Sequence, residues 1–198
     1  MRIASIVEGA GEVAAVPILL RRLQEWRTPE SFVEPLTPIR IHRDRVLKRD
    51  DEFSRYLKLA AAKCGDGGWI LVLLDADDDC PFELGTQVIR RAQTCVPYRR
   101  TSVVMANREY EAWFIAAAHS LHGQRGFSFD PADEVDPEKP RDAKGWIKTR
   151  MPGGAYGETT DQPAFSARMN LQQACDGSRS FRKLCSEWDS QVAMASNC

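Results

Sequence analysis

Two short acidic clusters, each directly after an apolar run, are the parts of this chain best suited to chemistry. The first holds Glu8 and Glu12, and the second is the segment Asp75–Asp79. Carboxylates packed together raise each other's pKa and repel, so a fold that joins the two clusters needs a compensating divalent cation. Oxygen ligands favour Mg²⁺ or Mn²⁺ over zinc. Ions held by Glu and Asp suit phosphoryl and phosphodiester chemistry.

Hydrophobic periodicity predicts the elements that position these clusters. The predicted strands are Arg2–Val7, Ile39–Ile41, Trp69–Leu74 and Thr101–Ala106. The predicted helices are Glu12–Trp26, Asp50–Cys64, Pro81–Thr94 and Glu109–Leu121. The strand Trp69–Leu74 is apolar throughout, which is typical of a parallel strand buried on both faces. The alternation predicts an α/β fold with a Rossmann-like, doubly wound, mainly parallel four-stranded sheet.

Both acidic clusters follow predicted strands at their carboxyl ends. Ligands of doubly wound sheets bind outside those ends. We therefore expect Glu8 to face Asp75 and Asp77 across one cleft. In an extended segment, Asp79 shares the parity of Asp75 and Asp77, which favours it over Asp78 as a fourth carboxylate at this site.

The chain changes character after residue 122. Phe127–Pro140 is rich in Pro, Asp and Glu and predicts an irregular loop, and Met151–Asp161 is Gly-rich without a period. Two helices are predicted afterwards, over Gln162–Cys175 and Ser178–Ser190. We therefore divide the chain into an α/β catalytic core, residues 1–122, and a loop-rich, helical C-terminal elaboration packed on it, residues 123–198.

Composition and charge narrow the function classes. The 198 residues carry a net charge of −1, so the whole chain is not a basic nucleic-acid binder. Basic residues gather locally in Arg40–Arg49 and Arg141–Arg150. Basic side chains around acidic motifs suit a metal-dependent enzyme that acts on a polyanion. No secretory signal, no apolar run of membrane length and no CxxC pair are present. We expect a cytoplasmic protein with reduced thiols and no membrane partner.

The acidic motifs resemble those of the Toprim domain, the catalytic module of type II and IA topoisomerases, bacterial primases and OLD-family nucleases. That family carries a Glu in a turn after its first strand, as in Val7-Glu8-Gly9, and an Asp-x-Asp after its third, as in Leu74-Asp75-Ala76-Asp77. More narrowly, the chain resembles small stand-alone Toprim-like, OLD-nuclease-related proteins found beside ATPase genes in bacterial defence loci. Three segments carry that likeness, namely Arg108–Phe114, Ala143–Gly145 and Arg179–Arg182.

The resemblance implies a set of site residues around Mg²⁺ or Mn²⁺. The metal ligands would be Glu8, Asp75 and Asp77, to which the parity argument adds Asp79. The implied catalytic set is Glu8, Glu12, Asp75, Asp77, Glu109, Glu111 and Lys144. Glu12, Glu109 and Glu111 join the metal shell or are acids that stabilise helix N-termini through the macrodipole, and both interpretations stay open. Lys144, together with Arg108, would neutralise a phosphate in the transition state.

The resemblance also implies a function and partners. It indicates a nuclease that hydrolyses phosphodiesters of DNA or RNA, in antiviral defence or DNA repair, with an ATPase subunit of the AAA or ABC type as partner and a homodimer as one assembly. The alternative is a non-catalytic, metal-binding sensor or partner subunit of an ATPase complex. A third interpretation comes from Gly9-Ala10-Gly11-Glu12-Val13-Ala14, which fits a dinucleotide fingerprint. Repulsion between the acidic clusters and a pyrophosphate argues against it.

Overall fold

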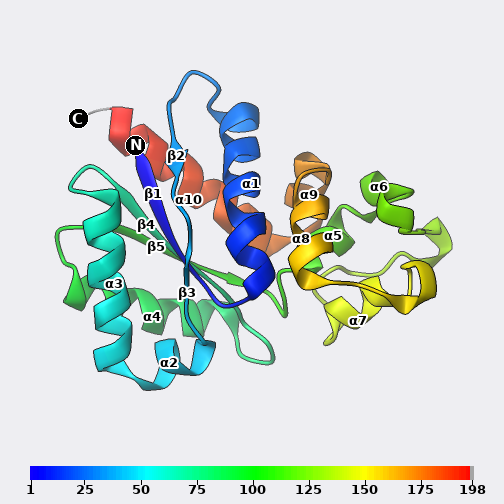
Figure 1. Ribbon diagram of the computed structural model, residues 1–198, viewed down its shortest axis with the longest axis horizontal. Coiled ribbons are helices and arrows are strands. Elements are labelled where there is room, and N and C mark those ends of the chain that lie inside the picture. The colour runs from blue at the N-terminus through cyan, green and yellow to red at the C-terminus, as the bar shows by residue number, and fades with distance from the viewer. Residues whose placement is uncertain (197–198) are drawn as a thin grey trace.

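The computed structural model describes residues 1–196, which form an α/β fold around one sheet (Figure 1). The five strands are β1 (Arg2–Val7), β2 (Glu34–Pro35), β3 (Ile39–Arg40), β4 (Trp69–Asp75) and β5 (Arg100–Ala106). The order is β2-β1-β4-β5, β3 pairs with β1, and every pairing among the described residues is parallel. The predicted α/β class with a mainly parallel sheet is confirmed.

The predicted count of four strands is wrong because the second strand is split. β2 pairs with the beginning of β1, and β3 pairs with its end. Between them the chain contains Pro38, and β2 itself ends at Pro35. Proline has no N–H to donate to a ladder, so it interrupts pairing and is tolerated at the edge of a sheet.

Ten α-helices and three short 3₁₀ turns complete the described chain. The helices are α1 (Ala10–Arg27), α2 (Arg43–Lys48), α3 (Asp50–Cys64), α4 (Pro81–Cys95), α5 (Ala112–Ala116), α6 (Ala118–Leu121), α7 (Ala143–Lys148), α8 (Glu158–Ser166), α9 (Leu171–Gly177) and α10 (Arg179–Ser196). The turns are Gln124–Gly126, Pro131–Asp133 and Pro152–Gly154. The sequence did not predict α2 or α7, which are only six residues long.

Two predicted helices are broken in the structure. The segment Glu109–Leu121 starts as a turn and becomes helical only from Ala112, and a break at Ala117 separates α5 from α6. The segment Gln162–Cys175 is two helices, because Asn170 interrupts it. The Asn170 side chain accepts a hydrogen bond from the backbone N–H of Gln173 at 3.0 Å and so caps α9.

Helices cover both faces of the sheet. Alternate strand residues such as Ile3 and Leu71 pack with α1 and α10, whereas their neighbours, Ala4 and Val72 among them, pack with α3 and α4. Figure 1 shows α1 and α10 on one side of the strands and α3 and α4 on the other. The predicted boundary at residue 122 assigns α10 to the C-terminal elaboration, although α10 covers one face of the sheet in the core.

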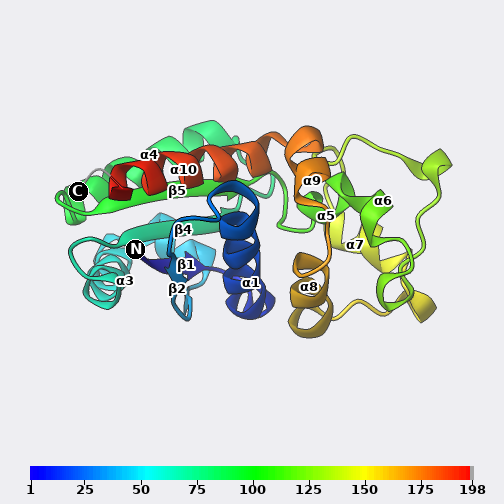
Figure 2. The same ribbon diagram turned by 90° about the horizontal axis from the view of Figure 1, so that it is seen from above.

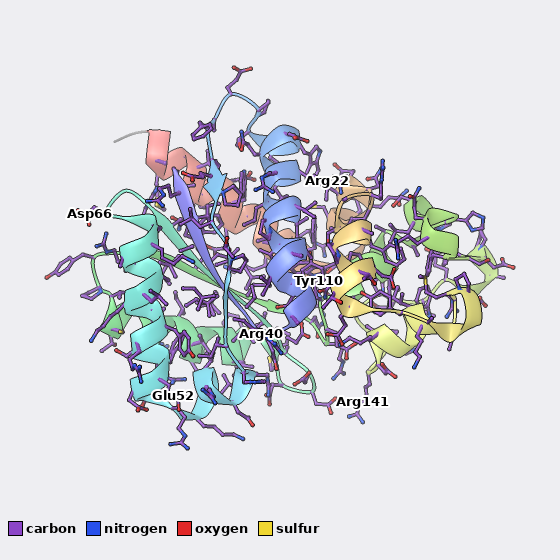
Figure 3. All side chains as sticks on the ribbon, viewed as in Figure 1. Arg22, Arg40, Glu52, Asp66, Tyr110 and Arg141 are labelled. Atoms are coloured by element: carbon purple, nitrogen blue, oxygen red, sulfur yellow. The ribbon has the colours of Figure 1, made fainter. Side chains whose placement is uncertain are left out.

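The helices α5–α9 form a C-terminal lobe beyond the carboxyl ends of β4 and β5 (Figure 2). Helix α8 lies against α1 and joins the lobe to the sheet layer. Tyr110 is fully buried where these helices meet (Figure 3), and its hydroxyl is 2.9 Å from the Ser166 hydroxyl of α8. The lobe is thus held in a fixed position opposite the ends of the strands.

Gly11 allows α1 and α8 to approach closely. A Cβ atom at this position would lie 2.2 Å from Gln162 Oε1 and 2.4 Å from the Glu158 carbonyl oxygen. We expect Gly11→Ala to push α8 away and to lower the free energy of unfolding by about 1–3 kcal/mol. Urea denaturation measures this. Gly67→Ala is the control, because nothing lies within 4 Å of a Cβ there, and equal stability of the two variants would contradict this packing.

The state of the cysteines and the character of the helices can be read from the described residues. The cysteines that the structure describes, up to Cys185, are free thiols. None of the helices within residues 1–196 has both the length and the apolar character needed to cross a membrane.

Candidate functional site

A small cavity of about 210 Å³ lies at the carboxyl ends of β1 and β4 and faces the C-terminal lobe. Its charged lining includes Glu8, Glu12, Asp75, Glu111, Lys144 and Glu158. Five carboxyl groups therefore share a space that also receives one lysine. The structure brings Glu8 and Asp75 together as the topology predicts, and Glu111 and Lys144 join them from beyond β5.

Glu8 follows β1 directly and has an unsatisfied oxygen. Its Oε2 atom is buried and has no hydrogen-bond partner among the described residues. Burial, followed by the negative charge of Asp77, raises the pKa of the Glu8 carboxyl. A buried oxygen without a donor is rare and calls for a proton or a cation.

Glu12 faces the cavity and also caps its own helix. Its Oε2 atom accepts the backbone N–H groups of Glu8 at 3.0 Å and Gly9 at 3.2 Å. Burial nevertheless raises the pKa of Glu12 to about 7, with smaller contributions from the charges of Glu111 and Glu8. The two interpretations of Glu12, helix acid and site residue, are thus compatible.

Asp75 ends β4 and is fixed by the next turn of the chain. Its Oδ1 atom accepts the backbone N–H of Tyr110 at 2.8 Å. Burial of the carboxyl group, reinforced by the charges of Glu12 and Glu111, raises the pKa of Asp75 well above its usual value. The negative charge of Glu12 thus disfavours the charge of Asp75, as expected for neighbouring carboxylates.

Glu109 and Glu111 lie in the turn before α5 and have different environments. The Glu111 Oε1 atom accepts hydrogen bonds from the Tyr156 hydroxyl at 3.0 Å and Gln162 Nε2 at 3.3 Å. Burial raises the pKa of Glu111 to about 7. Glu109 does not line the cavity, and its Oε2 atom accepts the backbone N–H of Lys144 at 2.7 Å. Glu109 therefore fixes the start of α7.

Asp77 and Asp79 lie outside the cavity, on the loop after β4. Both pair with Arg43, whose Nε atom is 3.5 Å from Asp77 Oδ2. Arg43 also donates to the carbonyl oxygens of Asp75 and Ala76, so one guanidinium organises the whole loop. Asp77 adopts a left-handed φ of 51°, and its negative charge still raises the pKa of Glu8.

Basic residues surround the same loop. Asp78 pairs with Arg108 at 2.7 Å and with Arg141 at 3.1 Å. The side chain of Arg40 donates from Nε to the Glu8 carbonyl oxygen at 3.1 Å and lines the cavity. The loop beside the acidic cavity thus carries three carboxylates that are paired with arginines.

Lys144 reaches the cavity from α7 and forms an ion pair with Glu158 Oε1 at 2.8 Å. Burial lowers the pKa of Lys144, but attraction to Glu158 and Glu111 outweighs burial, so the ammonium group stays charged. Sequence reasoning missed Glu158, Gln162 and Tyr156. They lie in or beside a Gly-rich segment without hydrophobic period, where no sequence signal assigned a role to them.

Glu12, Asp75 and Glu111 each accept hydrogen bonds from protein donors. Within residues 1–196, no group of three or more His, Cys, Asp or Glu side chains has the geometry of a metal site. The atom best able to accept a cation is Glu8 Oε2, which lacks any donor. The residues fit a hard divalent cation by chemistry, since every acidic group offers oxygen.

Comparison with known proteins identifies a family only. The family model described as "Domain of unknown function (DUF4276)" matches residues 7–188, which include every cavity residue described above. No curated protein and no solved structure matches the chain.

Proposed function

The chain belongs to the DUF4276 family, and from the geometry of its acidic cavity we propose that it is a metal-dependent phosphodiesterase that hydrolyses nucleic acid. The observation that carries the proposal is the buried, unpartnered Oε2 atom of Glu8 beside Asp75 and Glu12. The resemblance to Toprim nucleases, through Glu8 and the Asp-x-Asp at Asp75 and Asp77, supports the same proposal.

Electrostatics favours a cation in this cavity. Burial raises the pKa of Glu12 and Glu111 to about 7. Lys144 and Arg40 are the lysine and arginine in the lining, against five carboxyl groups. Glu8 and Asp75 would hold Mg²⁺ or Mn²⁺, with Glu12 beside them and Asp77 on the adjoining loop, whereas Asp79 stays with Arg43. Such an ion, when bound, supplies activation of water and compensation of phosphate charge.

The protein's own side chains supply the remaining functions. Glu111, with a pKa of about 7 and held by Tyr156 and Gln162, is suited to accept a proton from the attacking water. Lys144 neutralises charge on the phosphate. Arg40 lines the cavity and Arg141 pairs with Asp78 on the adjacent loop; both are labelled in Figure 3 and would attract a polyanion.

A dinucleotide at the end of β1 would need backbone N–H groups that already donate to a protein side chain. The backbone N–H groups of Glu8 and Gly9, which follow the strand where a pyrophosphate would bind, both donate to Glu12. Gly11 contacts α8 closely, so its missing side chain serves helix packing. Hydrolysis therefore explains the motif better than dinucleotide binding.

The setting of the activity follows from the same resemblance. We propose a cytoplasmic nuclease of antiviral defence or DNA repair that acts on DNA or RNA with an AAA or ABC-type ATPase subunit, alone or as a homodimer. The non-catalytic alternative, a metal-binding sensor, makes a different prediction in the assay below.

Purified protein should be tested with labelled single-stranded DNA, duplex DNA and RNA, in Mg²⁺, Mn²⁺ or EDTA. The proposal expects calorimetrically detectable metal binding and cleavage of at least one substrate that EDTA stops. Metal binding without cleavage would favour the sensor. If the protein neither binds the metal nor cleaves any substrate, both the nuclease and the sensor are rejected.

Lys144→Gln is expected to lower kcat about 100-fold, with a smaller effect on KM, because Lys144 acts on charge that develops in the transition state. Lys148→Gln, on the same short helix but exposed, is the matched control and should cleave normally. Steady-state cleavage rates measure both. Equal rates would remove Lys144 from the catalytic set.

A further inference from the structure

The two edges of the sheet differ in their ability to accept another strand. On one edge, β2 and β3 have two residues each, and Pro35 limits their pairing. On the other edge, β5 has seven residues and pairs only with β4 among the described residues. Proteins usually blunt edge strands with short length, proline or bulges, and β5 has none of these.

Alternate backbone groups of β5 point away from β4, toward the groove side of the sheet. The Ala106 carbonyl oxygen accepts the Ala76 N–H, so Ala106 points toward β4. Because backbone direction alternates along a strand, Thr101, Val103 and Met105 direct their N–H and C=O groups to the open side. Within the described residues, none of these outward groups has a partner strand.

A groove of about 690 Å³ lies over this open edge, between α4 and α10. Figure 2 shows both helices alongside β5. The wall on α4 is apolar and includes Phe82, whose surface is 79% exposed, and Ile89. Gly85 of α4 also lines the groove and faces Met105, so the absence of a side chain there keeps the groove deep.

The wall on α10 is charged, and its accessible charges are positive. Arg179 and Lys183 are exposed along much of their side chains, at 84% and 56%, and they pair with Glu138 at 3.6 Å and with Glu187. The acidic neighbours face inward: Glu138 accepts Ser178, Ser180 and Asn107 donors, and Glu187 accepts the Ser102 hydroxyl. Glu138 and Glu187 are only 8% and 21% exposed, so a bound segment would meet the two cations before their acidic partners.

We propose that this groove binds an extended segment of a partner protein, which pairs with β5 as an additional strand. Its side chains alternate, with apolar residues toward α4 and acidic residues toward Arg179 and Lys183. A second copy of this chain fits poorly, because its own β5 carries α4 and α10 on both sides and these would collide with the groove walls. The main-chain bonds supply affinity and the alternation supplies specificity.

A fluorescent heptapeptide of alternating valine and glutamate is the probe. We expect saturable binding by fluorescence anisotropy, together with slower hydrogen exchange at the amides of Val103 and Met105. A heptapeptide of alternating valine and lysine, and an N-methylated version of the first peptide, should bind at least about tenfold more weakly. Equal binding of all three peptides would overturn the proposal.

Three variants localise the binding. Val103→Pro removes an outward N–H without touching the β4 ladder, and Phe82→Ala removes the exposed ring, so each should weaken binding about tenfold. Phe32→Ala, an equally exposed ring at 79% elsewhere, is the control. Unchanged binding by Val103→Pro would overturn strand addition. A dimer in sedimentation that Val103→Pro converts to a monomer would instead assign the groove to a second copy.

Discussion

Changing Asp75 to Asn is expected to reduce Mn²⁺-dependent cleavage by at least ~1,000-fold while leaving the fold intact. The amide oxygen of Asn can still accept the Tyr110 N–H that Asp75 Oδ1 accepts at 2.8 Å. The variant thus keeps the shape and loses only the negative charge that would hold the cation. Cleavage rates and calorimetric Mn²⁺ binding should fall together.

Asp77→Asn provides a second test, and Asp66→Asn provides the control. Asp77 lies beside Arg43 and within electrostatic reach of Glu8, so its loss should also abolish cleavage if the ion is shared with Glu8. Asp66 lies in the turn before β4, and its side chain is 98% exposed. The Asp66→Asn variant should therefore cleave nucleic acid at the rate of the parent protein. Full activity in both Asp75→Asn and Asp77→Asn would reject the nuclease proposal.

The parallel sheet could be predicted because its strands have strong, simple signals. Trp69–Asp75 is apolar nearly throughout, and Arg2–Val7 begins and ends where the sequence indicates. The boundaries of Asp50–Cys64 also agree with the structure, since Gly65 with its positive φ ends that helix. The broken second strand and the breaks at Ala117 and Asn170 depend on local capping and proline effects that periodicity averages out.

The candidate site could be predicted in part, for a topological reason. Glu8 and Asp75 follow neighbouring parallel strands, so their convergence requires only the strand order. The alternation of side chains in an extended segment predicts Asp79 on the same face as Asp75 and Asp77. The loop instead turns at Asp77, where φ is positive, so this alternation does not hold there. Arg43 then holds Asp79. Glu158 enters from α8 through a tertiary contact with α1 that no local pattern encodes.

The same carboxylates predict an unusual dependence of stability on pH in metal-free protein. Glu12 and Glu111 have pKa values of about 7 in the folded state against an ordinary value of 4.5. Between these pH values the folded state binds more protons than the unfolded state, so the free energy of unfolding falls as pH rises from about 5 to about 8. One such group accounts for about 3 kcal/mol, and coupling makes their sum smaller than twice that.

Mn²⁺ should reverse this loss, because a cation replaces the protons that the carboxylates would otherwise need. We expect thermal melts in EDTA to show a lower melting temperature at pH 8 than at pH 5.5, and Mn²⁺ to raise it more at pH 8. Glu111→Gln keeps acceptor and donor groups near Tyr156 and removes one titrating carboxyl, so its melting temperature in EDTA should depend less on pH. The exposed Glu134→Gln variant is the control and should behave as the parent protein. A melting temperature that rises from pH 5.5 to pH 8 without metal would mean that burial and the neighbouring charges do not raise the pKa of these acids, and the argument for a cation at Glu8 and Asp75 would fail with it.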